Sequence, residues 1–221
     1  MKITKYKQSC FLVETKDLKL LIDPGSIDFD PELLESDWKD VDAIFITHKH
    51  GDHIEESAIS KLLENEDVVL YSTQEVKDHC PELNISIVKE GDVIIVGDVK
   101  IEVTHAVHGF IPKLKEKSIE IEENVGYIFD DGSTRFYHTS DCIGFSNDYK
   151  CDVLAIPVNN HGLCFGASDA AMFAKATDAT KIIPCHYDNP VFPADMDAVK
   201  EAFLKEELDL TILDYKESLE V

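Results

Sequence analysis

The sequence lacks long hydrophobic runs and clusters of positive charge. No apolar stretch approaches the roughly 20 residues that a membrane-spanning helix needs, and segment 1–8 has no signal-peptide core. The 21 Lys and Arg residues stand against 44 Asp and Glu residues, for a net charge of −23. Because no basic stretch stands out, a polyanion would be repelled. We therefore expect a cytoplasmic protein that binds no membrane and no nucleic acid.

Paired cysteines are absent as well. The six cysteines form no Cys-x-x-Cys pair and no framework spacing, which favours reduced thiols over disulfides. Cys142 and Cys185 each neighbour a candidate metal ligand, but a free cysteine is usually a small buried apolar residue. The cysteines are Cys10, Cys80, Cys142, Cys151, Cys164 and Cys185.

The length and composition fit one domain. A chain of 221 residues is long for one domain and short for two, and 44% hydrophobic residues can form a sizeable core. We expect a single domain over residues 1–221.

Alternating apolar residues and turn residues predict many short strands. Strands are expected at 2–6, 10–15, 18–22, 43–47, 84–88, 92–96, 99–107, 125–130, 134–138, 152–156 and 181–185, and helices at about 54–64, 73–79, 168–177 and 195–207. Each half then has a mostly β layer with helices, which indicates an α/β or α+β fold. The charged segment 110–123 is expected to be either a mobile flap over a site or a solvated connection.

The most informative motif follows the strand expected at 43–47. Three histidines and an aspartate occupy the six positions from His48 to His53. His48 and His50 share a strand face because side chains two apart point the same way, and the next turn can offer Asp52 and His53 to a second metal. Nitrogen and oxygen ligands without cysteine suit a catalytic zinc, manganese or iron site better than a closed structural zinc. The alternative is a surface histidine cluster with incidental metal affinity.

Further candidate ligands stand at the ends of later strands. The strand expected at 99–107 leads to His105 and His108, which fall on opposite strand faces. One of them is therefore expected to be a ligand, and the other a neighbour of the site, a substrate contact or part of the core. Asp141 follows another strand and can bridge two cations, although an Asp in such a turn is often a local cap. His186 ends a further apolar strand.

These residues resemble the metallo-β-lactamase superfamily. The resemblance rests on Asp23-Pro24, the His-x-His-x-Asp-His motif, and the later histidine, aspartate and histidine in family order. It implies a four-layer αββα sandwich of two mixed β-sheets with helices outside, and two divalent metal ions. The implied ligands are His48, His50 and His108 for one metal, Asp52, His53 and His186 for the other, and Asp141 as the bridge.

Within the superfamily, the pattern is similar to the metal-dependent hydrolases that include L-ascorbate-6-phosphate lactonase. The similar stretches are 106–108, 156–159, 166–171 and 183–187. Segment 6–10 departs from the Gly-His-Ser/Ala type of segment that many relatives carry, and the lactonase is longer. This resemblance implies hydrolysis of a sugar lactone or phosphorylated sugar lactone and suggests manganese, whereas the nitrogen and oxygen ligands themselves admit zinc, manganese or iron.

The expected mechanism is metal-assisted hydrolysis. Two divalent ions about 3.5–4 Å apart generate hydroxide from water near neutral pH. Asp52 is expected to orient the hydroxide and accept its proton, and His161 to protonate the leaving group or bind substrate. Tyr187 is a further candidate for contact with an oxygen anion.

Two other functions stay open from the sequence. One is hydrolysis of a small cyclic phosphodiester or a phospholipid head group by the same metal pair. The other is a non-enzymatic metal-binding protein that keeps the fold. The expected partner is a small-molecule substrate, and homo-oligomerisation is open.

Overall fold

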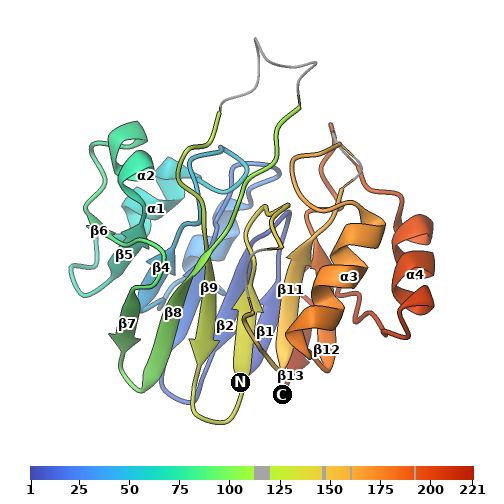
Figure 1. Ribbon diagram of the computed structural model, residues 1–221. Helices are drawn as coiled ribbons and strands as arrows, with labels where there is room; N and C mark the ends of the chain where they lie inside the picture. The colour runs from blue at the N-terminus through green and yellow to red at the C-terminus, as the bar shows by residue number, and fades with distance from the viewer. Residues whose placement is uncertain (112–119, 146–147, 160, 192) are drawn as a thin grey trace. The chain divides into compact units, whose positions relative to one another are not determined.

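A computed structural model of the chain describes residues 1–111, 120–145, 148–159, 161–191 and 193–221 (Figure 1). The chain divides into two compact units, which we call the first unit (Met1–Lys89 with Leu213–Val221) and the second unit (Glu90–Ile212). Each unit has its own β-sheet and its own hydrophobic core. The single domain expected over residues 1–221 stays a prediction.

The first unit contains a mixed seven-stranded sheet in the order β13-β1-β2-β3-β4-β5-β6. The strands are β1 (Lys2–Lys5), β2 (Phe11–Glu14), β3 (Lys19–Ile22), β4 (Ala43–Phe45), β5 (Val69–Ser72), β6 (Ile85–Ile87) and β13 (Ser218–Glu220). Neighbouring strands are antiparallel from β13 to β3 and parallel from β3 to β6. Because β3 and β4 are parallel, their carboxyl ends lie at one edge of the sheet, where Asp23 meets the loop that starts at Thr47.

Short helices follow the parallel strands of the first unit. They are the 3-10 helix η1 (Pro31–Glu35) and the α-helices α1 (Glu56–Leu62) and α2 (Gln74–His79). The start of α2 is capped by Thr73, whose side chain accepts a hydrogen bond from the Val76 amide. The buried α1 residues Ile59 and Leu62 join the core beneath the sheet. This core holds β4 and the histidine-bearing loop that follows it.

The second unit contains a mixed six-stranded sheet in the order β12-β11-β10-β9-β8-β7. The strands are β7 (Val93–Val96), β8 (Val99–His105), β9 (Val125–Asp130), β10 (Arg135–His138), β11 (Val153–Pro157) and β12 (Lys181–Cys185). Strands β7 to β10 are antiparallel, whereas β10, β11 and β12 are parallel. The carboxyl ends of these three parallel strands share one edge, and Asp141, Asn159 and His186 follow them there.

Two longer helices complete the second unit, α3 (Ala167–Thr177) and α4 (Met196–Lys205). Figure 1 shows α3 beside β11 and β12 and α4 on the other side of α3, and α3 contacts both β11 and α4. Their buried residues Phe173, Val199 and Phe203 belong to the core of this unit. The Asp195 side chain caps α4 by accepting hydrogen bonds from two backbone amides of its first turn. These helices therefore fix the strands that carry the candidate ligands.

The two mixed sheets with helices confirm the predicted fold class. The sequence prediction missed η1, β5 and β13, and it made the first α-helix longer than α1 is. Residues 112–119 of the expected flap or connection lie outside the described residues. Within the described part of the chain, no helix has the length and apolar character needed to span a membrane.

Candidate metal centre

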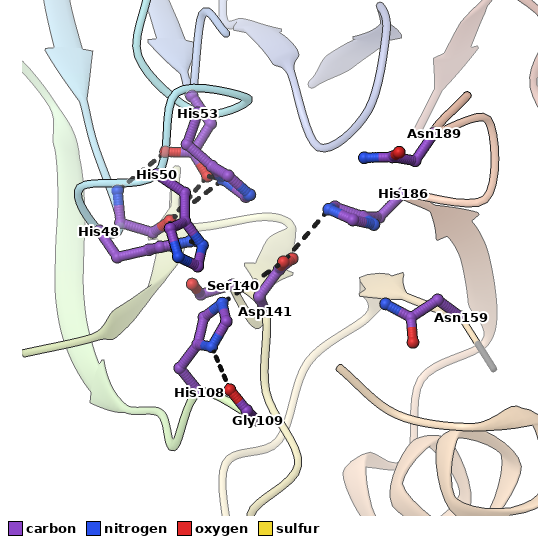
Figure 2. A network of polar contacts seen from close by, with 12 residues as sticks. His48, His50, His53, His108, Gly109, Ser140, Asp141, Asn159, His186 and Asn189 are labelled. Carbon is purple, nitrogen blue, oxygen red and sulfur yellow. Dashed lines mark hydrogen bonds and ion pairs between the residues drawn. The ribbon is translucent and has the colours of Figure 1, made fainter. Parts of the chain in front are cut away.

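The first unit gathers three histidines on the loop after β4 (Figure 2). His48 and His53 are fully buried, and their ring centroids are 4.0 Å apart. Nε2 of His48 and Nδ1 of His50 are 3.1 Å apart. Two imidazole nitrogens on one tetrahedral zinc would be about 3.3 Å apart, given zinc–nitrogen bonds of about 2.0–2.1 Å. The predicted pairing of His48 with His50 therefore has a separation that suits a shared metal.

Asp23 orients this loop from the end of β3. Its carboxylate is fully buried and accepts hydrogen bonds from the Thr47 amide and the Thr47 hydroxyl, both at 2.8 Å. It also pairs with Nδ1 of His53 at 2.7 Å, and the Thr47 hydroxyl lies 3.0 Å from Nδ1 of His48. When each Nδ1 carries the proton, Nε2 of each histidine has the lone pair that a metal ion requires. The sequence marked Asp23 only as part of a family motif and missed this orienting role.

Asp52 is held by a tight turn in the same loop. The His53 amide donates to the His50 carbonyl at 2.9 Å, and carboxylate and imidazole ligand atoms of Asp52 and His53 lie within 4.8 Å of one another. Gly25 passes so close that a Cβ there would stand 1.8 Å from the Asp52 carbonyl oxygen. Only glycine allows this approach. The loop after β3 thus clamps the residues predicted to bind the second metal.

The second unit gathers its own ligands at the carboxyl ends of the parallel strands (Figure 2). Asp141 and His186 are each 1% exposed, and Oδ2 of Asp141 lies 3.2 Å from Nε2 of His186. Nε2 of His108 lies 3.8 Å from the same oxygen. His186 has a positive φ of 60°, a conformation that costs energy for a non-glycine residue and is concentrated at functional sites. The three predicted ligands of this unit therefore converge.

His108 is fixed by backbone contacts. Its Nδ1 lies 2.6 Å from the Gly109 carbonyl oxygen, so this nitrogen is the donor, and Nε2 is the ring nitrogen on the side of Asp141. The Gly109 amide in turn donates to the Leu163 carbonyl at 2.8 Å. A Cβ on Gly109 would lie 1.8 Å from the Gly162 carbonyl oxygen, so the close approach requires glycine.

Three other predicted residues have different surroundings. His105 is 35% exposed in its side chain, and its Nδ1 pairs with Glu90 at 2.8 Å on the surface. The candidate acid His161 is exposed. Tyr187 is half-buried and packs against the core of the second unit. Of the two histidines weighed at the end of β8, His108 and not His105 is the one beside Asp141.

Two residues near Asp141 were not among the predicted site residues. Sγ of Cys164, the Asp141 carboxylate and an imidazole nitrogen of His186 all lie within 4.8 Å of one another. Asn159 is 1% exposed, and its Oδ1 accepts a hydrogen bond from the His161 amide at 2.9 Å. Asn159 was marked only as the last residue of segment 156–159, which resembles the lactonase group, and no local pattern marked Cys164.

Burial raises the pKa of two other cysteine thiols near the ligand loops. In the first unit, burial and the Asp23 carboxylate raise the pKa of Cys10 well above its usual range. In the second unit, burial raises the pKa of Cys142, whose sulfur contacts the Gly144 amide at 3.3 Å. The Cys142 side chain is therefore a neutral thiol that contacts its own loop. Its burial agrees with the expectation of a small buried residue.

Comparison with known proteins places the chain in a family. Residues 2–186 match the model described as the β-lactamase superfamily domain. The chain is 27% identical to a UPF0173 metal-dependent hydrolase of Christiangramia forsetii, with full coverage of both chains. It is 29% identical to one of Salinibacter ruber, with 92% of each chain covered.

A solved structure shows the same fold. The metallo-β-lactamase fold protein YhfI from Bacillus subtilis aligns with a TM-score of 0.78 at 16% identity, covering 99% of this chain and 98% of the other. At this identity the likeness concerns the fold alone, and it agrees with the two mixed sheets of this chain. With the family match over residues 2–186, it follows that the chain belongs to the β-lactamase superfamily domain family.

Proposed function

We propose that the protein is a metal-dependent hydrolase with a dinuclear metal centre. The observation that carries the proposal is that each unit buries imidazole and carboxylate ligand atoms within reach of one another, in a chain of this superfamily. The relatives from C. forsetii and S. ruber bear the name metal-dependent hydrolase. The proposed ligands are His48, His50 and His108 for one metal, Asp52, His53 and His186 for the other, and Asp141 as the bridge.

The donor set fits divalent metal ions. Imidazole and carboxylate suit zinc, manganese and iron(II), and the pairing of Asp23 with His53 is the carboxylate–histidine arrangement that orients metal ligands. A buried carboxylate and imidazole such as Asp141 and His186 are costly unless each has a partner of opposite charge or a metal. We propose two divalent ions, manganese or zinc, with iron as an alternative.

The protein's own residues have separate tasks in this proposal. When bound, the metal ions supply a hydroxide from water and polarise the bond that is broken. Asp52 orients the attacking oxygen and accepts its proton. His161 lies on an exposed loop and protonates the leaving group or contacts the substrate. Its exposure leaves it accessible to a substrate that enters from solvent.

We propose a sugar lactone or a phosphorylated sugar lactone as substrate. The support is the resemblance of segments 106–108 and 183–187 to the lactonase group. A small cyclic phosphodiester or a phospholipid head group is the second candidate, since the same metal pair stabilises attack on phosphorus. A long nucleic acid is disfavoured by the net charge of −23. The proposed setting is the cytoplasm, with a small-molecule substrate and no macromolecular substrate.

The test is acid release by metal-reconstituted protein over a panel of sugar lactones, phosphorylated sugar lactones and small cyclic phosphodiesters. His50→Ala removes a proposed ligand, and His79→Ala is a matched control because His79 is exposed at the end of α2. We expect lactone turnover in wild type and His79→Ala and none in His50→Ala. Normal turnover by His50→Ala would contradict the two-metal assignment.

The same panel separates the alternatives. Turnover of a phosphodiester with silence on every lactone would move the protein to the second substrate class. Full metal occupancy with silence on the whole panel would favour the non-enzymatic metal-binding protein. Metal content is therefore measured on the same samples.

A further inference from the structure

A third ligand atom stands beside Asp141 and His186 in the second unit. Sγ of Cys164 belongs to a group in which the sulfur, the carboxylate oxygen and the imidazole nitrogen all lie within 4.8 Å of one another, and all three residues are buried. Carboxylate, imidazole and thiolate together are a ligand set for zinc. The proposed dinuclear centre uses Asp141 and His186 and leaves Cys164 without a role.

The separations are compatible with a shared metal. A zinc–sulfur bond of about 2.3 Å and zinc–nitrogen bonds of about 2.0–2.1 Å place the two ligand atoms about 3.6 Å apart in a tetrahedral site. A separation of at most 4.8 Å thus needs Sγ of Cys164 to approach by at most about 1.2 Å. Rotation about the Cα–Cβ bond of Cys164 moves its sulfur in this way.

The backbone holds Cys164 at the end of β11. On one side, the Leu163 carbonyl accepts a hydrogen bond from the Gly109 amide at 2.8 Å. On the other side, Phe165 forms a parallel bridge with Val158, and its carbonyl accepts from the Asn159 amide at 3.0 Å. Leu163 is therefore held to Gly109, the neighbour of the candidate ligand His108, and Phe165 is held to the residues that follow β11. Backbone hydrogen bonds on both sides fix the position of Cys164.

Asn159 supplies an independent sign of a ligand at this place. Its side chain is nine-tenths or more buried, and Nδ2 has no hydrogen-bond partner among the described residues. The His161 amide holds Oδ1 of the same side chain at 2.9 Å, and Figure 2 shows the amide nitrogen on the side of Asp141 and His186. A buried amide donor without an acceptor is costly. An electron-rich group bound in the site would accept this hydrogen bond.

The alternative role for Cys164 is that of a small buried apolar residue. Two other cysteines of the same unit have that role, because Cys142 and Cys151 pack in its hydrophobic core. Cys164 instead lies beside a carboxylate and an imidazole. Its polar surroundings therefore favour a ligand over a core residue.

We propose that Cys164 is a sulfur ligand of the metal ion held by Asp141 and His186. The inference rests on the proposed metal centre and deepens it by specifying the metal. On binding, the thiol proton is released and the thiolate forms the metal–sulfur bond, with no change in oxidation state. A soft thiolate selects zinc, cobalt or iron over manganese. The metal at this position is then zinc-like, against the manganese that the lactonase resemblance suggests.

Cobalt(II) substitution tests the proposal with a spectroscopic readout. A thiolate bound to Co²⁺ gives an intense charge-transfer band in the near ultraviolet, which nitrogen and oxygen ligands do not give. The titration uses wild type, Cys164→Ser, Cys164→Ala and the control Cys151→Ser, whose sulfur is buried in the core of the same unit. We expect the band in wild type and Cys151→Ser and its loss in both Cys164 variants.

A competition between zinc and manganese supplies a second readout. Loss of an outer contact to a ligand already weakens metal binding about 10–100-fold, so loss of a direct ligand is expected to weaken zinc binding at least about 10-fold. The ratio of zinc affinity to manganese affinity should fall by a similar factor in Cys164→Ser. An unchanged preference would overturn the proposal.

A measurement on the wild-type protein covers the case in which the variants do not fold. X-ray absorption of the zinc-loaded wild type should show a zinc–sulfur distance of about 2.3 Å. A zinc shell of nitrogen and oxygen neighbours alone would overturn the proposal.

The outcomes distinguish this inference from the proposed function. Two bound cobalt ions and normal hydrolysis without the charge-transfer band would refute the sulfur ligand and leave the hydrolase standing. A band that persists in Cys164→Ser would assign the sulfur to another cysteine and also refute the inference. Failure of the wild type to bind cobalt or zinc would refute both.

Discussion

Replacing Asp23 by asparagine probes how the histidine loop is oriented. The Asp23 carboxylate accepts hydrogen bonds from the amide and the hydroxyl of Thr47 and from Nδ1 of His53, at 2.7–2.8 Å. Asparagine has the same size but only one acceptor oxygen, so at least one buried donor faces an NH₂ group. Hydrogen bonds to a charged group contribute about 1.5–3 kcal/mol, and an unsatisfied buried donor costs about 1–3 kcal/mol. We expect Asp23→Asn to lower the free energy of unfolding by about 2–4 kcal/mol.

The same substitution should weaken metal binding. Removing the carboxylate partner of a ligating histidine typically costs about 10–100-fold in metal affinity. The assay combines urea unfolding of the metal-free protein with zinc titration against a chromophoric chelator. Asp42→Asn is the matched control, since Oδ2 of Asp42 accepts a single backbone hydrogen bond from the Lys19 amide at 2.7 Å. We expect the control to lose about 1 kcal/mol and to keep wild-type zinc affinity.

Two results would refute this reasoning. If Asp23→Asn were destabilised but bound zinc as tightly as wild type, then Asp23 would be a structural contact with no influence on the ligands. If neither stability nor affinity changed, the hydrogen bonds to Thr47 and His53 would contribute nothing. A loss of affinity that matches the loss in Asp42→Asn would also remove the orienting role.

Three further predictions follow from local geometry. His108→Ala should lower metal affinity at least about 10-fold and abolish turnover, whereas His105→Ala should leave both unchanged; the reverse result in a metal titration would exchange their roles. Gly25→Ala should destabilise the protein by about 1–3 kcal/mol or more in urea unfolding, because the new Cβ meets a backbone oxygen at 1.8 Å; wild-type stability would contradict the clash. Hydrogen bonding to Arg135 lowers the pKa of Glu102, so its stabilisation is present above about pH 4 and is lost as the pH falls. Glu102→Gln should then show a smaller loss of stability on acidification than wild type, and an equal loss would disprove the contribution.

Much of the strand pattern was predictable because it is local. Strands such as β2, β3 and β12 alternate or concentrate apolar residues between turn residues, and this pattern is present in short windows of sequence. β5 was missed because its run Val69–Ser72 is short and stands between two helices, where a buried strand and a helix end look alike. β13 was missed because its three residues form a strand only by pairing with β1. A strand that forms only by pairing with residues far away in the sequence has a weak local sequence pattern.

The candidate site divides in the same way. His48, His50, Asp52 and His53 form one contiguous motif, so the chemistry and the order of the residues predict a metal site without knowledge of the fold. The orienting contacts of Asp23 depend on the parallel pairing of β3 with β4. That pairing is not visible in the loop sequence. The motif therefore predicted the ligands and not the residue that positions them.

The proposed role of Cys164 depends on contacts that the sequence does not show. In the sequence, Cys142 and Cys185 are the cysteines that neighbour candidate ligands, but they were expected to be small buried apolar residues, and adjacent residues often point to different sides of the backbone. Cys164 comes near Asp141 because Phe165 bridges back to Val158 at the end of β11, a contact between segments on either side of a tight loop. Ligand partners in a sheet protein are neighbours along the edge where parallel strands end, and not neighbours along the chain. A search for metal-binding cysteines in such folds should therefore follow the strand order. Here the order runs from β10 through β11 to β12, and Phe165, the neighbour of Cys164, pairs with Val158 directly after β11.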